Sequence, residues 1–369
     1  MQTTQSVRTV GVEEEYLLVT PEGGTASVSP AVLRHAHLSR AARGATAEDD
    51  RPGGDVEKEF KQEQIEISTH PHESLADLLE DLRGRRRQAD EAAQRAGARI
   101  AALGTSPHKV RPTTLPDRRA HEIRAHFGYT AGEQLTCGCH VHVSITDERD
   151  GVRIVDTLRP WAPVLMALSA NSPSWQGRST SYASYRSQVW GRWPTAGPTA
   201  PFGTPEEYHR VVEELLATGT ILDDGMIYFD ARLSARYPTV EVRVADVCLD
   251  AADAVLQAAL VRGLADSPAV DQPRTELLRA ASWRAGKDGV TGTLVHPLTG
   301  KPAPAAEVVG ALVEHARPTL ERLGDDELVD RLVGDVLLRG TGAVQQQSWR
   351  AQGATDDEVV RRATAVTVR

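Results

Sequence analysis

The sequence predicts an α+β fold in which helices back one face of an antiparallel sheet and the other face is polar. Five short segments alternate apolar residues with charged or ligand-type residues, which is the side-chain period of a β-strand. Stretches with helical periodicity lie between and after these segments. Such alternation is typical of antiparallel sheets that pack one face on the core and open the other. The segments cover residues 11–19, 62–67, 140–145, 227–232 and 239–244.

The composition is that of a globular protein. Hydrophobic residues make up 40% of the 369 residues and charged residues 25%, which excludes a disordered chain. The chain has no internal repeat and no obvious linker, so we expect a single domain over residues 1–369. The formal net charge is −9, and Arg83–Arg87 form a basic block only within a helical stretch with acidic neighbours. This charge argues against a nucleic-acid-binding protein.

The chain shows no feature of export or of membrane insertion. Residues 1–5 lack the basic and apolar regions of a signal peptide. No apolar run approaches the roughly 20 residues that span a bilayer. With three cysteines and no export signal, disulfides are not expected. We therefore expect a soluble cytoplasmic protein that does not bind membranes.

The first strand candidate carries three consecutive glutamates. In a strand, Glu13 and Glu15 lie on one face, where two neighbouring carboxylates repel each other. A bound divalent cation is the usual compensation for such a pair. Glu14 lies on the opposite face with Val12 and Tyr16, so a buried Glu14 needs a partner, such as an arginine from a packing helix.

The remaining elements follow in chain order. Residues 41–56 lack periodicity and are expected to form a flexible loop, whereas residues 74–103 have one apolar stripe and are expected to be helical. Residues 204–207 combine a capping Thr, a first-turn Pro and a Glu three positions after the cap, which predicts a helix start. Residues 250–265 predict another helix, and residues 304–369 are mainly helical in pattern.

The other strand candidates repeat the polar alternation of the first. Glu66 shares a face with Gln64 opposite two isoleucines, and in 227–232 the residues Tyr228, Asp230 and Arg232 are expected to lie together. Carboxylates and a histidine with flanking arginines suit a divalent metal that holds a polyphosphate. If the strands pair in one sheet, its polar face collects Glu13, Glu15, Glu66, His140, His142, Asp230, Arg232, Glu241 and Arg243.

Other interpretations of these residues remain. Each segment taken singly also fits an ordinary solvated strand, and only the recurrence over five segments favours a ligand site. Cys137, Cys139, His140 and His142 offer four soft ligands, but Cys139 and His140 point to opposite faces, which disfavours zinc. The chain has no Gly-x-x-x-x-Gly-Lys-Ser/Thr motif of a P-loop kinase and no Gly-x-Gly-x-x-Gly motif of a dinucleotide enzyme.

Several motifs resemble those of a known family. Residues 11–16, 138–143 and 239–244 are similar to the signature strands of the second glutamate–cysteine ligase family, and specifically to its YbdK-like carboxylate–amine ligases. The stretches 177–194 and 234–238 strengthen the resemblance, which covers nearly the whole chain.

The resemblance implies both a fold and a reaction. The implied fold is a glutamine-synthetase-like, curved antiparallel sheet that forms an active-site trough, backed by helices, in a single catalytic domain. In the implied reaction, ATP phosphorylates a carboxylate, typically the γ-carboxylate of glutamate, and an amine such as cysteine displaces phosphate from the acyl phosphate. The implied ligands are ATP, Mg²⁺ and small-molecule substrates, and a homodimer is a reasonable expectation.

The resemblance also assigns site residues. A histidine is an unusual Mg²⁺ ligand, so His140 leaves Mn²⁺ or direct phosphate contact open. Arg243 would face the transferred phosphoryl group, where a planar cation stabilises spread charge. We expect catalytic roles for Arg243 and Arg186, nucleotide contacts from Arg178, Arg232 and Arg243, and substrate contacts from Arg186, Tyr182 and His142. The matching metal positions are Glu13, Glu15, Glu59, Glu66, His140 and Glu241.

One segment departs from the family pattern. Where relatives often carry arginines in a Gly-x-Gly-Ala-x-Arg-Gln-Arg stretch, residues 340–347 carry glutamines at both arginine positions. Either the ligand differs or this segment is a surface helix start. The alternatives to glutamate and cysteine are therefore a ligase of the same fold for another amino acid and amine, and a non-catalytic ligand-binding protein.

Overall fold

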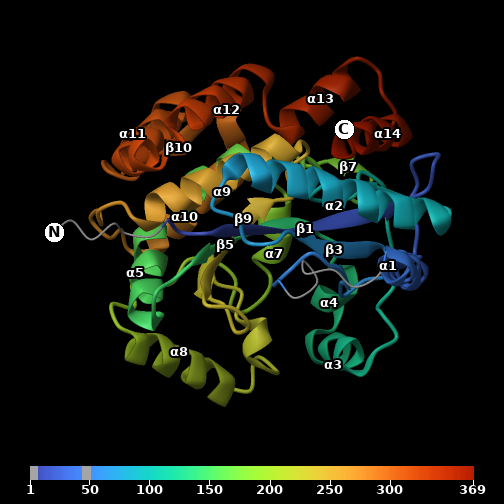
Figure 1. Ribbon diagram of the computed structural model, residues 1–369, viewed down its shortest axis with the longest axis horizontal. Coiled ribbons are helices and arrows are strands. Elements are labelled where there is room, and N and C mark those ends of the chain that lie inside the picture. Colours follow the sequence, from blue (N-terminus) through green and yellow to red (C-terminus); the bar gives the residue numbers. More distant parts are fainter. Residues whose placement is uncertain (1–6, 44–50) are drawn as a thin grey trace.

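The five strand candidates pair in one antiparallel sheet, which confirms the α+β prediction. A computed structural model describes residues 7–43 and 51–369 (Figure 1). The sheet has the strand order β2-β3-β1-β5-β9-β8, and β4 pairs with β1. Its strands are β1 (Val10–Val19), β2 (Val56–Lys58), β3 (Gln64–Ser68), β4 (Arg99–Ala101), β5 (Gly138–Ser144), β8 (Ala231–Leu233) and β9 (Thr239–Asp246). The small pairs are β6 (Ser174–Trp175) with β7 (Arg178–Ser179), and β10 (Thr293–Val295) with β11 (Pro302–Pro304).

Helices cover one face of the sheet and flank the other. In Figure 1, α2 and α9 run across the sheet, and the C-terminal helices α11 and α12 lie beyond them. Helices α3, α4 and α8 lie on the opposite side. The helices are α1 (Ser29–Arg43), α2 (Leu75–Arg95), α3 (Arg118–Phe127), α4 (Tyr129–Glu133), α5 (Glu148–Leu158), α6 (Ala162–Ser169), α7 (Arg186–Trp190), α8 (Pro205–Ala217), α9 (Ala251–Ala265), α10 (Thr275–Asp288), α11 (Ala305–Leu323), α12 (Asp326–Arg339), α13 (Gly342–Ala351) and α14 (Asp356–Thr367). Single 3₁₀ turns span Asp224–Met226 and Gly289–Thr291.

The covered face of β1 contains a buried charge pair. Glu14 is 0% exposed, and Arg86 on α2 donates to both of its carboxylate oxygens, at 2.9 and 2.7 Å. The hydroxyl of Tyr16 also donates to Glu14. Arg86 extends this network, because its remaining donors bind the backbone oxygens of Cys248, Leu249 and Thr367. The expected arginine partner of a buried Glu14 is therefore confirmed.

Two of the expected helices have the predicted start. The Thr204 side chain accepts a hydrogen bond from the backbone N–H of Glu207 at 3.2 Å, as a capping residue does. The Asp250 carboxylate caps α9 in the same way, through Ala252 N–H. Almost every residue of α9 is buried, because it packs between the sheet and the C-terminal helices.

The predicted helix over residues 74–103 is wrong in its second part. Helix α2 ends at Arg95, and Gly97 takes a φ of 74°, which turns the chain back. Residues Arg99–Ala101 then form β4 against β1. Of the predicted loop 41–56, residues 41–43 belong to α1 and Val56 begins β2. Residues 44–50 lie outside the described residues.

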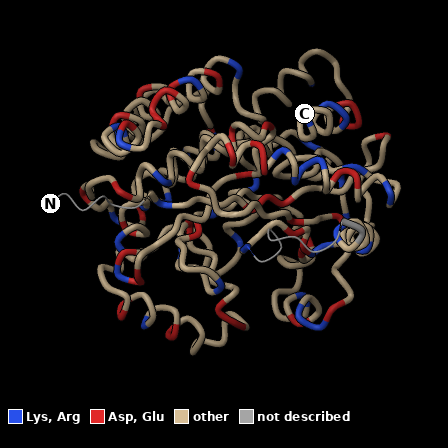
Figure 2. The backbone as a smooth tube through the Cα atoms, in the orientation of Figure 1, with Lys and Arg blue, Asp and Glu red and all other residues tan. Residues whose placement is uncertain are grey.

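Charges of both signs are interspersed on the outer helices (Figure 2). Arg317 on α11, for example, binds Asp330 on α12 at 2.8 Å. Within the described ranges, no helix has the length and apolar character needed to cross a membrane.

Candidate active site

The register of the sheet brings the predicted polar residues together on its open face. Glu13 on β1 lies opposite His140 on β5, and Glu15 lies opposite Glu66 on β3. His142 lies opposite Glu241 on β9. We call the resulting cavity the trough; its volume is about 720 Å³. The predicted residues that line it are Glu13, Glu15, Glu59, Glu66, His140, His142, Arg232, Glu241 and Arg243.

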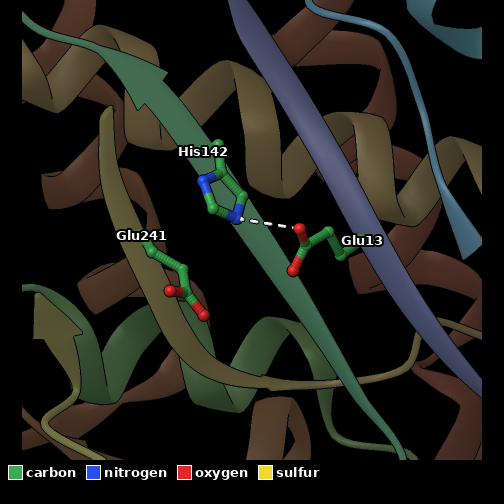
Figure 3. Close-up of side chains that lie close together, drawn as sticks. All are labelled: Glu13, His142 and Glu241. Atoms are coloured by element: carbon green, nitrogen blue, oxygen red, sulfur yellow. Dashed lines mark ion pairs between the residues drawn. The ribbon is translucent and has the colours of Figure 1, made fainter. Parts of the chain in front are cut away.

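His140 lies at the centre of the carboxylates. Its Nδ1 atom is 3.7 Å from Glu13, 3.9 Å from Glu66 and 3.8 Å from Glu241. Its Nε2 atom is 3.8 Å from Glu15. The neighbouring His142 points toward Glu13, with 3.4 Å between Nε2 and the nearer carboxylate oxygen, and Glu241 faces the same space (Figure 3). These separations are longer than hydrogen bonds and leave room between the groups.

The donor set fits divalent cations. Three overlapping groups offer ligand atoms within 4.8 Å of one another: Glu13 with His142 and Glu241, Glu13 with Glu66 and His140, and Glu15 with Glu59 and Glu66. The Nε2 atoms of both histidines are buried without a hydrogen-bond partner among the described residues. Unpartnered imidazole nitrogens beside several carboxylate oxygens are a donor set that suits a divalent cation.

The electrostatics of the trough point the same way. Burial and the neighbouring Glu15 raise the pKa of Glu59 to about 8. Burial, Glu13 and Glu59 raise the pKa of Glu66 well above its usual range. Burial and the charge of Arg243 lower the pKa of His140 to about 3, so its imidazole is neutral and able to bind a cation. Glu59 and Glu66 therefore hold their protons at neutral pH unless a bound cation offsets their charges.

Two arginines hold Glu241 on one side of the trough. Arg232 donates to one carboxylate oxygen at 2.8 Å, and Arg243 donates to the other. The Arg243 guanidinium also lies 5.8 Å from the ring centre of Trp190 and 5.9 Å from that of Tyr228, as in cation–π contacts. Burial lowers the pKa of Arg243 to about 10, so the group stays charged at neutral pH.

Arg186 is held by a buried network beneath the sheet. The Asp246 carboxylate accepts hydrogen bonds from Ser172 Oγ at 2.6 Å and Ser184 Oγ at 2.8 Å. Ser172 Oγ in turn accepts from the Arg186 backbone N–H at 2.9 Å. A side chain at Gly138 would place its Cβ 2.3 Å from Arg186 Nη2, so the guanidinium needs glycine there. Arg186 does not line the trough but a chamber beside it.

Three predicted residues lie elsewhere. Arg178 is exposed on β7, the second strand of the β6–β7 hairpin, and Tyr182 packs against Trp283 of α10; neither lines the trough. The expectation that Asp230 shares a face with Tyr228 and Arg232 is wrong. Strand β8 begins only at Ala231, so the alternation does not extend to Asp230, which lines the neighbouring chamber instead.

The zinc interpretation has no support in this geometry. Cys137 and Cys139 are buried and free, and neither belongs to a candidate ligand group in the described part of the chain. The Cys137 thiol instead accepts a hydrogen bond from Gln64 Nε2 at 3.3 Å.

Sequence reasoning missed Asp246, Gly138 and Trp190. Asp246 had a detectable signal, because it falls on the same side of β9 as Val242 and Val244, and an acid on an apolar face needs partners. Gly138 stood inside a recognised motif without an assigned reason. Trp190 gave no signal, since a tryptophan in a short helix is usually a core residue.

A smaller apolar chamber adjoins one end of the trough. Its volume is about 160 Å³, and Glu13, Glu66 and His142 line both cavities. Gly11 and Pro238 are among the residues that line only the smaller chamber. The trough thus extends, beside Gly11 at the start of β1, into a chamber whose lining residues are mainly uncharged and which Arg243 does not line.

The sheet, its backing helices and its carboxylate-lined open face define a glutamine-synthetase-like fold. Two solved structures share this fold. The glutamate–cysteine ligase from Francisella tularensis in complex with AMP has a TM-score of 0.70 at 12% identity, over 99% of this chain and 89% of that one. The bifunctional glutathione synthetase from Pasteurella multocida has a TM-score of 0.70 at 17% identity, over 98% of this chain but 52% of that one, so this chain spans about half its length.

Sequence similarity identifies the family. A family model described as Glutamate-cysteine ligase family 2 (GCS2) matches residues 9–365. A Streptomyces avermitilis protein named "Putative glutamate--cysteine ligase 2-1" is 49% identical over 363 residues, which cover 96% of this chain and 98% of that protein. The chain therefore belongs to glutamate–cysteine ligase family 2, as the motif resemblance predicted. Family and fold make it an ATP-dependent carbon–nitrogen ligase.

Proposed function

We propose that the trough phosphorylates the γ-carboxylate of glutamate with ATP and joins the acyl phosphate to an amine such as cysteine. The observation that carries this proposal is the row of three overlapping carboxylate and imidazole groups beside Arg243. A carboxylate and a triphosphate repel each other, and only a site with several cation positions can hold both.

The residues have distinct roles in this reaction. Glu13, Glu15, Glu59, Glu66, His140, His142 and Glu241 would hold divalent cations, Mg²⁺ or Mn²⁺, which neutralise and align the phosphates. Arg243 reaches the same space from β9 and stabilises the negative charge on the transferred phosphoryl oxygens. Arg232 holds Glu241 in place through its hydrogen bond.

The proposed reaction has two steps. A carboxylate oxygen of the acid attacks the γ-phosphorus, the bond to the β,γ-bridging oxygen breaks, and ADP leaves. The amine nitrogen then attacks the acyl carbon, the carbon–oxygen bond to phosphate breaks, and the amine loses a proton as the amide forms. Each turnover yields one ADP, one phosphate and one amide.

The shape of the cavities supports a direction for ATP. The small chamber beside Gly11 is lined mainly by uncharged residues and adjoins the cation positions, so it suits the base and ribose. The acid would then bind toward Arg243. The sequence predictions of a cytoplasmic location and of a homodimer stay predictions.

The decisive experiment is a screen of acids and amines with ATP and either Mg²⁺ or Mn²⁺, with ADP, phosphate and amide measured together. We expect release of ADP and phosphate only when both substrates and a divalent cation are present, with glutamate the best acid. A chelator should stop the reaction. ADP release that needs no acid would reject the proposal, and a different best pair would assign the ligase to other substrates.

A non-catalytic binding protein would give no ADP with any pair. The buried Gln346 does not favour that alternative, because it is 1% exposed and donates to Asn171 at 2.7 Å as part of the fold. The glutamine segment that departs from the family pattern is thus the start of α13 and lines none of the cavities described above.

A further inference from the structure

The chamber that Arg186 lines is distinct from the small chamber beside Gly11 and lies behind another wall of the trough. Its volume is about 240 Å³, and Trp190, Tyr228 and Arg243 line both cavities. Arg186 and Asp230 line this chamber, which we call the rear chamber, and neither lines the trough. Asp230 also lines a small neighbouring cavity beside Arg159. None of the candidate cation ligands belongs to it. The rear chamber is thus adjacent to the phosphoryl-transfer space but separate from the carboxylate row.

One part of the rear chamber presents buried donors without acceptors. Arg186 is 2% exposed and Arg243 is 8% exposed, and the Nε atom of each has no hydrogen-bond partner in the described part of the chain. Ser282 Oγ, from α10, is buried in the same unpartnered state. Buried donors without acceptors destabilise a fold, so these groups need an acceptor. A carboxylate is the small anion that matches planar guanidinium donors.

Another part of the rear chamber presents an acceptor without a donor. The Asp230 backbone is fixed, because its N–H donates to Gly197 and its oxygen accepts from the Arg243 N–H. No described residue donates a hydrogen bond to its carboxylate. Burial raises the pKa of Asp230 to about 7, and only the charge of Arg159 opposes that rise. A cationic group with N–H donors would stabilise the ionised carboxylate.

The walls of the rear chamber are aromatic. Trp190 and Tyr228 lie 4.8 Å apart between ring centres and separate the chamber from the trough. Trp283 lines the chamber and is 46% exposed, so it stands where the chamber meets solvent. The chamber therefore combines donors, an acceptor and apolar surface within a volume suited to one small molecule.

We propose that the rear chamber binds the amine substrate as a zwitterionic α-amino acid, with its carboxylate at Arg186 and Arg243 and its ammonium group at Asp230. This assignment as the amine substrate rests on the proposed ligase reaction; the binding of a zwitterion does not. ATP and the acid would occupy the trough, so the amine would approach from another side. Before the attack, the ammonium group passes a proton to the Asp230 carboxylate, and the neutral nitrogen then moves from Asp230 to the acyl carbon in the trough. The wall that contains Arg243 is the boundary that the two cavities share.

The binding test needs no turnover. The neutral L-α-amino acids that occur in proteins are titrated one by one, by calorimetry, into the wild type and into Asp230→Asn. The matched control is Asp271→Asn, because Asp271 is exposed. We expect at least one to bind, its decarboxylated amine to bind roughly tenfold or more weakly, and Asp230→Asn to weaken it by a similar factor. Asp271→Asn should bind as the wild type does. No binding by any of them, or an unchanged affinity in Asp230→Asn, would overturn the proposal.

The turnover test separates the amine from the acid. In Asp230→Asn, the KM of the amino-acid amine should rise roughly tenfold or more, while the KM values of glutamate and ATP stay within about twofold. A rise in the KM of glutamate instead would place the acid in the rear chamber and overturn the assignment. If the ligase reaction itself fails, the calorimetric result still decides whether a zwitterion binds.

Discussion

The two faces of strand β1 treat the same residue type in opposite ways. On the covered face, Glu14 is enclosed by Arg86 and Tyr16, and its charge is matched within the fold. On the open face, Glu13 and Glu15 lie among further carboxylates, and the arginines nearby do not balance them. Of three consecutive glutamates, one thus has its charge matched within the fold, and the other two lie where we propose that cations bind. Burial alone does not distinguish them, and Glu15 also accepts a backbone hydrogen bond from Gly138; what distinguishes Glu14 is its hydrogen-bonded arginine.

The largest effect on stability is expected when the Glu14–Arg86 pair on the covered face of β1 is broken. In Arg86→Met, Glu14 loses the opposite charge and keeps only the Tyr16 hydroxyl as a donor, and three backbone oxygens lose their donor. We expect the free energy of unfolding to fall by about 3–5 kcal/mol, measured by chemical denaturation. A wild-type denaturation midpoint would contradict this account of Glu14.

The matched control is the double variant Glu14→Met/Arg86→Met. It removes both charges and should recover part of the loss, because a buried pair can be replaced by apolar residues at little cost. Full recovery is not expected, since the oxygens of Cys248, Leu249 and Thr367 still lack their donor.

On the open side, the strongest effect should come from Glu241→Gln. The change removes a cation ligand and the partner of two arginines, but no contact of the covered face. We expect ADP formation to fall by about 10²–10³-fold, with an unfolding midpoint near that of the wild type. Glu148→Gln, on the exposed side of α5, is the matched control. Turnover close to normal in Glu241→Gln would refute the trough as the reaction site.

A smaller loss is expected from Arg243→Lys. A lysine keeps the charge but cannot present two parallel donors to phosphoryl oxygens. The rate of ADP formation should fall roughly 10–100-fold, with Arg317→Lys on α11 as the control. An unchanged rate would show that Arg243 does not contact the transferred group.

The smallest effect concerns the pH dependence of the metal-free protein. Because the folded pKa of Glu59 is raised above its ordinary value to about 8, the folded state holds this proton more tightly than the unfolded state does. The metal-free protein should therefore lose stability as pH rises between about 4.5 and about 8. Divalent cations should raise the melting temperature by a few degrees at the upper end of this range and less at the lower end. In Glu59→Gln, the cation-induced rise in melting temperature should differ less between the two ends of this pH range. An equal rise at both ends in the wild type would contradict the role given to Glu59.

The contrast between the two faces was visible in the sequence. Period-two alternation separated Glu14 from its neighbours and placed Glu66, His140, His142 and Glu241 on one face, because strand geometry is local. It also predicted that Glu14 would need an arginine. The family resemblance supplied Glu59, which lies between strands, where alternation says nothing.

The features that the sequence did not predict depend on tertiary contacts. Helix α2 ends after Arg95 because of one glycine and a three-residue strand, β4, and the helical sequence pattern continues through both. Asp230 leaves the predicted face because it precedes β8, and its N–H donates to Gly197 although its oxygen still accepts from Arg243 on β9. Arg178 and Arg186 are close in sequence, but Arg178 is exposed on β7 whereas Arg186 is buried at the start of α7.

The Arg86 network has a consequence for the order in which the protein can fold. Its partners are Glu14, Cys248, Leu249 and Thr367, and the last is 281 residues away in sequence. During synthesis, Arg86 cannot donate to the oxygen of Thr367 until helix α14 has left the ribosome. Contacts this distant close slowly, because the chain must first lose the entropy of a long loop. We therefore expect nascent chains to hold an incompletely sealed core and to engage chaperones until the last helix docks.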